Sequence, residues 1–138
     1  MAEFSTYMEN KIIEVMRATN FTAVAAYVAL FTAVTGLEDD NPTDEVPTAG
    51  GTLYTRKLAG LSAAVGDGIS SNAGDITFPT AGAAWGTVTH CALVDHETNV
   101  TWGTDVHVLM WTELDAPKAV GTGDTFKISA GDLDVTIA

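Results

Sequence analysis

The first apolar positions of the chain recur with the spacing of one helix face. The stripe follows the i, i+4, i+7, i+11 pattern and is one residue wider near its end: Met8, Ile12, Val15, Met16 and Thr19. Thr6 precedes the stripe and Glu9 lies three residues later, which is the spacing of a capping box. Asn20 tolerates the left-handed conformation that ends helices. The pattern predicts an amphipathic helix over about 6–19.

The next apolar run, from Ala23 to Ala33, alternates like a strand that is buried on both faces. Tyr27 and Phe31 fall on one face, whereas Val28 and Leu30 fall on the other. A strand with two apolar faces needs cover on both sides. We therefore expect a central strand here, and the N-terminal helix is a candidate for the element that packs on its second face.

A polar segment from Gly36 to Gly51 follows this strand. It combines glycines, two prolines and a run of carboxylates. Glycine and proline interrupt regular structure, and runs of like charge are mostly solvated. The segment is predicted to be an acidic surface loop.

The rest of the chain consists of short apolar runs separated by turn residues about every 8 to 12 positions, a pattern typical of sandwiches and barrels. Candidate strands begin near Leu53, Leu61, Asp75, Gly86, Val106, Thr125 and Leu133. The clearest alternation covers 126–128 and 133–137, on the two sides of Gly131. These last two strands are predicted to form a hairpin.

These elements predict a mainly β fold, a β-sandwich of Ig-like or jelly-roll-like type with one N-terminal α-helix. A length of 138 residues is that of one domain, so 1–138 is expected to be a single unit. Within it we expect the helix at about 6–19, the sandwich at about 23–138 and the acidic loop at about 36–51. The 13 glycines and the many threonines and valines also favour sheet and turn over helix.

Charge and cysteine content narrow the classes of function. The net charge of −12 repels phosphate backbones and anionic lipids, so neither nucleic acid nor membrane is an expected partner. Cys91 is the only cysteine, which excludes an internal disulfide and predicts an intracellular site of synthesis. The sequence has no signal-peptide pattern at its start and no apolar stretch of about 20 residues.

Ligand-type side chains are densest at His90, Cys91, Asp95 and His96. His90 and Cys91 are neighbours on a predicted strand and point to opposite faces, which argues against a catalytic pair. A zinc site from His90, His96 and His107 would need a fourth ligand and convergent geometry that the spacing does not predict. A buried, unreactive thiol is the favoured interpretation of Cys91.

The common catalytic and cofactor motifs are absent from the sequence. The acidic run lacks the calcium-loop spacing, no serine lies in G-x-S-x-G, and neither glycine-rich phosphate motif occurs. Trp85, Trp102 and Trp111 are more simply explained as core or interface residues than as a sugar-stacking platform. The sequence therefore predicts a protein that is not an enzyme and needs no cofactor or metal.

Three segments resemble a family of small tailed-phage structural proteins described as head-decoration (cement) or tail-fibre proteins. They are YVALFTA at 27–33, NAGDITFPTAGAAWGTVTHCALVD at 72–95 and LDAPKAVGTGDTFKISAGDLDVTI at 114–137. The resemblance implies a virion structural protein built from β-sandwich subunits that assemble as homotrimers. The segment HETNVTWGTDVH at 96–107 departs from the glycine-rich stretch frequent in the family.

The resemblance leads to two expectations of function. The first is a cement protein on the outer capsid surface, made in the host cytoplasm, that binds the major capsid protein and stabilises contacts between its subunits. The alternative is a tail-associated or tail-fibre protein, with or without host-glycan contact. For the cement protein the helix and the acidic loop are the expected contact elements, with Met8, Ile12, Val15, Met16, Glu38, Asp39 and Asp40 as candidate residues.

Overall fold

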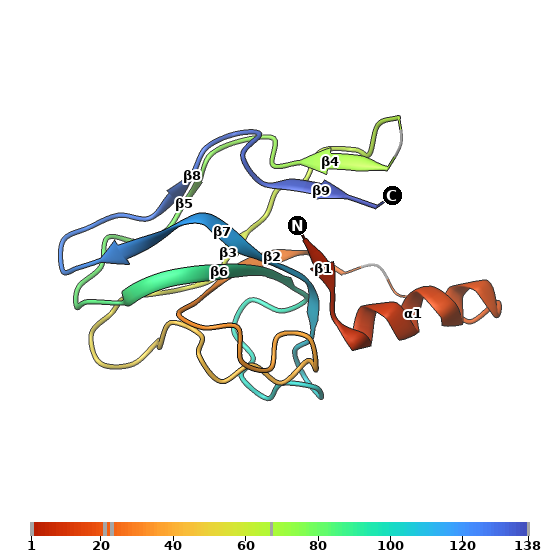
Figure 1. Cartoon of the computed structure of the whole chain (residues 1–138), viewed down its shortest axis with the longest axis horizontal. Helices are drawn as coiled ribbons and strands as arrows, with labels where there is room; N and C mark the ends of the chain where they lie inside the picture. The colour runs from red at the N-terminus through yellow and green to blue at the C-terminus, as the bar shows by residue number, and fades with distance from the viewer. Residues whose placement is uncertain (1, 21, 23, 67, 138) are drawn as a thin grey trace.

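The computed structural model describes residues 2–20, 22, 24–66 and 68–137. Its largest element is a five-stranded antiparallel sheet with the strand order β1-β7-β6-β2-β3 (Figure 1). In that order the strands span Glu3–Phe4, Val108–Val120, Gly86–Val94, Tyr27–Phe31 and Lys57–Leu58. The predicted fold class, mainly β with one N-terminal helix, is confirmed. Positions 1, 23 and 138, which bounded the predicted domain and sandwich, lie outside the described residues.

Strand β2 is buried on both faces, as its alternation predicts. Val28 and Leu30 belong to one core cluster, whereas Ala29 and Phe31 belong to a second cluster on the opposite face of the sheet. The second face is not covered by the N-terminal helix. It is covered by loop residues, including Leu37 from the acidic segment, so that part of the prediction is wrong.

The first core cluster lies between the sheet and two short ribbons that form a second layer. Strand β4 (Ile69–Ser71) pairs with β9 (Asp134–Thr136), and β5 (Ile76–Thr77) pairs with β8 (Lys127–Ile128). Aromatic rings fill the space between the layers. Phe78 packs edge-on against Trp85 and Phe126 with ring centroids 6.3 and 5.7 Å apart.

The predicted hairpin of the last two strands is wrong. Strands β8 and β9 follow one another in the chain, yet each pairs with a strand from its middle. The buried side chain of Asn72 explains this arrangement. Its amide nitrogen donates to the Ser129 carbonyl at 2.8 Å and its oxygen accepts from the Leu133 amide at 2.9 Å. Asn72 thereby holds the connecting turn against the middle of the chain.

The single described helix, α1, spans Thr6–Met16 and extends away from the body of the molecule (Figure 1). Its cap is Ser5 rather than the predicted Thr6, because the Ser5 hydroxyl oxygen accepts from the Met8 amide at 3.3 Å. The helix ends three residues before the predicted boundary, where Ala18 adopts a left-handed φ of 62°. Neither this helix nor any other in the described residues is long and apolar enough to cross a membrane.

Candidate interaction site

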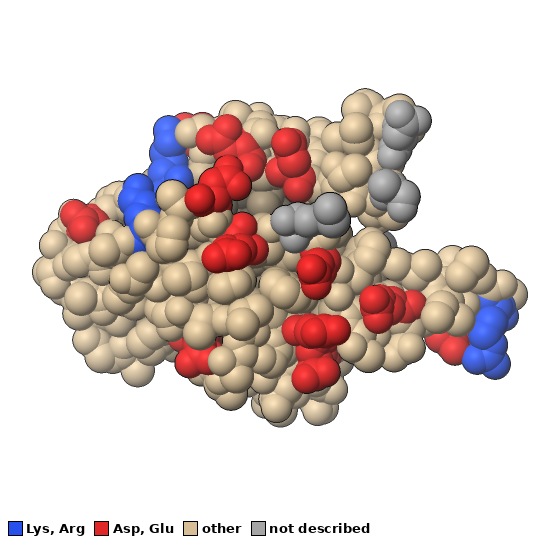
Figure 2. All heavy atoms as spheres, in the orientation of Figure 1, with Lys and Arg blue, Asp and Glu red and all other residues tan. Residues whose placement is uncertain are grey.

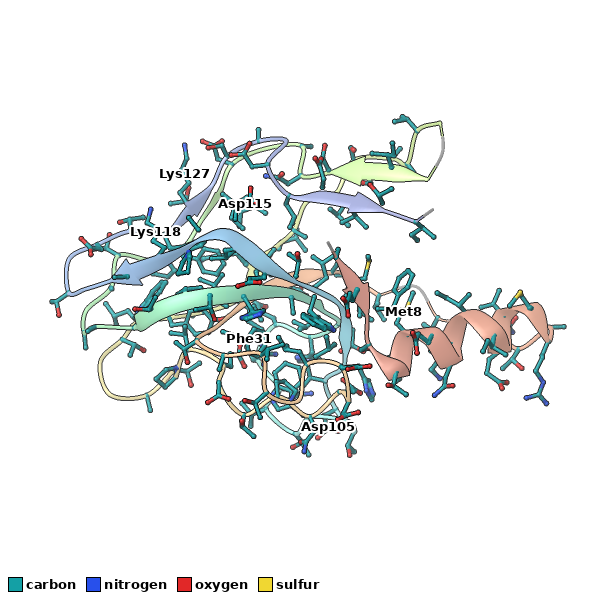
Figure 3. All side chains as sticks on the ribbon, viewed as in Figure 1. Met8, Phe31, Asp105, Asp115, Lys118 and Lys127 are labelled. Atoms are coloured by element: carbon teal, nitrogen blue, oxygen red, sulfur yellow. The ribbon has the colours of Figure 1, made fainter. Side chains whose placement is uncertain are left out.

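Helix α1 exposes much of its apolar face to solvent. None of its residues is buried, and Ile13, Val15 and Met16 are 51%, 51% and 74% exposed. Met8, at the root of the helix, is half-buried and packs against the first core cluster (Figure 3). Ile12 is also half-buried. The predicted stripe is therefore divided: its beginning packs on the chain's own core, and its end is largely exposed to solvent.

An 11-residue helix has little stability of its own. Isolated helices shorter than about 12 to 15 residues are marginal in water, and most helices in proteins are stabilised by packing of their apolar face. Among the named elements α1 contacts only β1 and β7, near its beginning. The last two turns of α1 are therefore a candidate interaction surface.

The base of α1 is held by a set of polar and aromatic contacts that we call the helix anchor: Ser5, Tyr7, Asp40, His107 and Val108. The Tyr7 ring stacks on the His107 ring with centroids 3.7 Å apart and planes 3° from parallel. One Asp40 oxygen lies 2.5 Å from His107 Nδ1, and the other accepts from the Val108 amide at 2.6 Å. The buried Ser5 hydroxyl donates to the Val108 carbonyl. These contacts fix the direction in which α1 leaves the sheet.

The anchor also brings the helix together with the acidic segment. The Thr6 amide donates to the Glu38 carbonyl at 2.8 Å, two residues before Asp40. Burial, and then the negative charges of Asp95 and Asp40, raise the pKa of the Tyr7 hydroxyl. The two predicted contact elements, far apart in the sequence, therefore form one continuous site.

The predicted acidic contact residues occupy different environments. Glu38 and Asp39 are exposed, as expected for a solvated loop. Asp40 is only 7% exposed, and both of its oxygens are engaged in the anchor. A direct contact between Asp40 and a partner does not fit this position. Its carboxylate instead joins the loop to β7 because buried carboxylates require hydrogen-bond donors.

A second internal network holds the far end of the acidic segment. Glu45 accepts from Arg56 Nε and Nη2, both at 2.7 Å, and Arg56 Nη1 donates to the carbonyls of His96 and Asn99 at 2.9 Å. The Arg56 guanidinium also lies 4.8 Å from the centre of the Trp102 ring. Arg56 is 4% exposed. The loop is therefore fixed at both ends rather than free in solvent.

The ligand-type cluster around Cys91 does not converge. Cys91 belongs to the first core cluster, while the adjacent His90 lies on the other face of β6, near Trp111. Burial raises the pKa of the Cys91 thiol to about 11, which keeps it neutral. His96 instead accepts from the amides of Thr98 and Asn99. Across residues 2–20, 22, 24–66 and 68–137, no three His, Cys, Asp or Glu side chains are grouped so as to hold a metal ion.

The three tryptophans do not form an open platform. Trp85 is 3% exposed and donates from Nε1 to the Thr52 carbonyl at 2.9 Å. Trp102 is half-buried under Arg56. Trp111 lines a cavity of only about 20 Å³, and its buried Nε1 has no hydrogen-bond partner among the described residues. The structure gives no stacking surface for a sugar ring at these positions.

Sequence reasoning missed the helix anchor and the Arg56 network. Tyr7 lies on the polar side of the helix pattern, and His107 was considered only as a metal ligand. Neither residue carried a local signal, since the contacts that His107 makes with Asp40 and Tyr7 join positions 67 and 100 residues apart. Arg56 carried no distinctive signal either, because Lys57 directly follows it and nothing local tells which of the two cations is buried and paired.

The described residues form a mainly β body with one projecting amphipathic helix, and a protein-family comparison identifies the class of protein. The family model described as "Podophage GP4 fiber I protein gp80" matches residues 3–136, nearly the whole chain, and the chain belongs to this family. It is accordingly a structural component of a phage particle. No curated protein matches the sequence.

Proposed function

We propose that the protein is a tail-associated component of the phage fibre apparatus. The main support is the family match, which spans residues 3–136 and concerns a fibre protein. This match favours the tail-fibre interpretation over capsid decoration. The net charge of −12 disfavours contact with packaged nucleic acid or a membrane surface and suits an outward position on the particle.

In this proposal the protein works by binding, without catalysis or a cofactor. The side chains most suited to chemistry are engaged in internal contacts. Cys91 is a buried neutral thiol, and Asp40 with His107 holds the helix anchor. A protein that binds only the assembled structure stabilises it by mass action, by about 2.7 kcal/mol per site at a hundredfold excess over the dissociation constant.

Helix α1 is the proposed contact element with the neighbouring virion subunits. Its exposed apolar residues supply the surface, and the anchor presents this surface in one direction. Pre-orientation matters because a docking element that is already ordered loses less entropy on binding. The exposed Glu38 and Asp39 lie beside the anchor and extend the proposed contact region.

The test is to locate the protein in purified heads and purified tails of its phage by quantitative mass spectrometry. We expect stoichiometric recovery in tails. Recovery in heads alone would contradict the tail location and restore the decoration interpretation, with the major capsid protein as partner. The same preparation with Ile13→Ser and Met16→Ser together should lose the protein from particles. Asn10→Ser, an exposed polar change on the same helix, is the matched control.

Point substitutions are preferable to truncation in this experiment. Deleting residues 2–20 would also remove β1 and the buried Ser5, both of which contact β7. A truncated protein could then fail because its sheet edge is damaged. Normal incorporation of the Ile13/Met16 variant would show that α1 is not the contact element.

A further inference from the structure

Two loops that lie side by side in Figure 1 enclose a pocket of about 460 Å³. Its lining comes from 45–56, the end of the acidic segment with the residues that follow it, and from 97–100, in the loop after β6. We call it the loop pocket. Small-molecule sites in proteins typically have volumes of about 300 to 1,000 Å³, so this pocket is large enough for a ligand. It contains none of the residues of the helix anchor.

Arg56 lines the loop pocket and has one N–H donor to spare. A guanidinium carries five N–H donors. Glu45 accepts from Nε and Nη2, and two backbone carbonyls accept from Nη1, which accounts for four of the five. Across residues 2–20, 22, 24–66 and 68–137, the second Nη2 hydrogen has no acceptor. Arg56 is 4% exposed, and a buried donor without an acceptor beside a pocket points to an oxygen atom supplied by a ligand.

Leu53 is held at the edge of the pocket in a strained backbone conformation. Its φ of 60° lies in the left-handed region, which bulky residues rarely adopt. The residues on either side, Thr52 and Tyr54, are buried, and this turns the Leu53 side chain outward, where it is 61% exposed. Strained residues of this kind gather at ligand clamps and active sites. Val100 lines the same pocket and is 70% exposed, so each loop offers an apolar side chain to a ligand.

The polar groups of the pocket suit a ligand that both donates and accepts hydrogen bonds. A hydroxyl group can donate one hydrogen bond and accept two. Three exposed threonines contribute such hydroxyls to the lining: Thr48, Thr55 and Thr98. The exposed carboxylate of Glu97 adds an acceptor, and Arg56 adds its spare donor.

The charge of the site disfavours ionic ligands. Glu45 balances Arg56 in a close pair with a contact of 2.7 Å, so Glu97 is the one further charged residue in the described lining. In Figure 2 carboxylates are spread over the face that is drawn, whereas Lys and Arg appear only at its upper left and at the end of α1. With a net charge of −12 the chain repels an anionic ligand. A cationic ligand would meet only the exposed Glu97, so a neutral ligand fits the pocket best.

We propose that the loop pocket binds a neutral saccharide chain of the host cell surface. The hydroxyl groups of a sugar donate and accept hydrogen bonds, and these match the threonine hydroxyls and the spare N–H of Arg56. Its C–H faces pack against Leu53 and Val100, and no tryptophan is required. This inference rests on the proposed function, in which a component of the fibre apparatus meets the host surface, and it names the class of ligand. In Figure 1 α1 extends away from both loops, so docking through α1 leaves the pocket accessible.

The test is isothermal titration calorimetry of the full chain with oligosaccharides from the neutral surface polysaccharide of the bacterium that the phage infects. We expect saturable binding that changes less than about twofold between about 0.05 and 0.5 M NaCl, because salt screens only interactions between charges. Thr55→Val with Thr98→Val keeps the shape of both side chains and should raise the dissociation constant about tenfold. The matched control is Thr87→Val with Thr136→Val, two exposed threonines outside the pocket, which should leave the dissociation constant unchanged.

Two further substitutions test the apolar residues of the pocket. Leu53→Asn suits a left-handed backbone, so it should keep or raise the melting temperature while it weakens saccharide binding about fivefold. Val100→Ser should weaken binding to a similar extent. Val65→Ser, at a valine outside the pocket that is 67% exposed, is the control and should have no effect. Full affinity in both the Leu53 and the Val100 variants would overturn the assignment of the pocket.

The failure of this inference is distinguishable from failure of the proposed function. A folded protein that is recovered in tails but binds no host oligosaccharide, or binds equally well after the Thr55/Thr98 change, would overturn the saccharide pocket and leave the fibre role standing. Binding that disappears at high salt would also overturn it, because the ligand would then be recognised through charge. Saccharide binding by a protein that is found in heads alone would support the pocket and contradict the tail location.

Discussion

Replacing Asp40 by alanine tests whether the helix anchor stabilises the fold. The change removes the acceptor of the Val108 amide at 2.6 Å and the partner of His107 Nδ1 at 2.5 Å. A hydrogen bond to a charged group contributes about 1.5 to 3 kcal/mol, and an unpaired buried donor costs a similar amount. Asp40 is 7% exposed, so water cannot readily replace it. We expect a loss of about 4 kcal/mol in the free energy of unfolding.

The assay is urea denaturation followed by tryptophan fluorescence. Asp39→Ala, one residue away on the exposed side of the segment, is the matched control and should change the free energy of unfolding by less than about 0.5 kcal/mol. Asp40→Asn keeps an acceptor for the Val108 amide and should fall between the two. A loss below about 1 kcal/mol for Asp40→Ala would refute the reasoning, because the anchor would then contribute no more than a surface contact.

Three further predictions concern the interior. Glu45→Gln leaves the Arg56 guanidinium buried without its counterion and should lower the free energy of unfolding by about 3 kcal/mol in denaturant titration; a loss under about 1 kcal/mol would contradict this. The Cys91 thiol, with a pKa of about 11 against an ordinary 9.0, should react with iodoacetamide at pH 8 about 100-fold more slowly than in denatured protein, and equal rates would disprove its burial. Gly36→Ala places a Cβ 2.1 Å from a backbone oxygen at φ +76° and should reduce the melting temperature far more than Gly50→Ala, which has the same φ and open space.

Strands with a clear alternation of side chains between their two faces could be predicted from the sequence. The alternation from Tyr27 to Phe31 gives a strand with two buried faces, and β6 begins at the expected Gly86. Strand pairing could not be predicted in the same way. The separation of β8 from β9 depends on the amide of Asn72, about 60 residues distant, and nothing local marks that contact.

Only those parts of the interaction site that depend on residues close together in the sequence could be predicted. Periodicity located the helix and its apolar face, and the charge run located the acidic segment. Periodicity cannot decide whether an apolar face packs on its own chain or on a partner. The sequence left both possibilities open, as a cover for the central strand and as a contact element, and in the structure no residue of α1 is buried. The anchor was out of reach because Tyr7, Asp40 and His107 meet only after the sheet has formed.

The apolar stripe of α1 packs on the core at its beginning and is exposed at its end, and this division supports a binding role for the helix. Natural sequences are locally consistent with their folds, and a disagreement between pattern and packing is expected mainly at functional sites. Met8 packs against the chain's own core, whereas Val15 and Met16, in the same stripe, are 51% and 74% exposed. A helix kept only for the fold would end after Met8 and Ile12 or would bend back onto the sheet. We propose that the two additional turns, presented by the helix anchor, bind a surface of a neighbouring subunit.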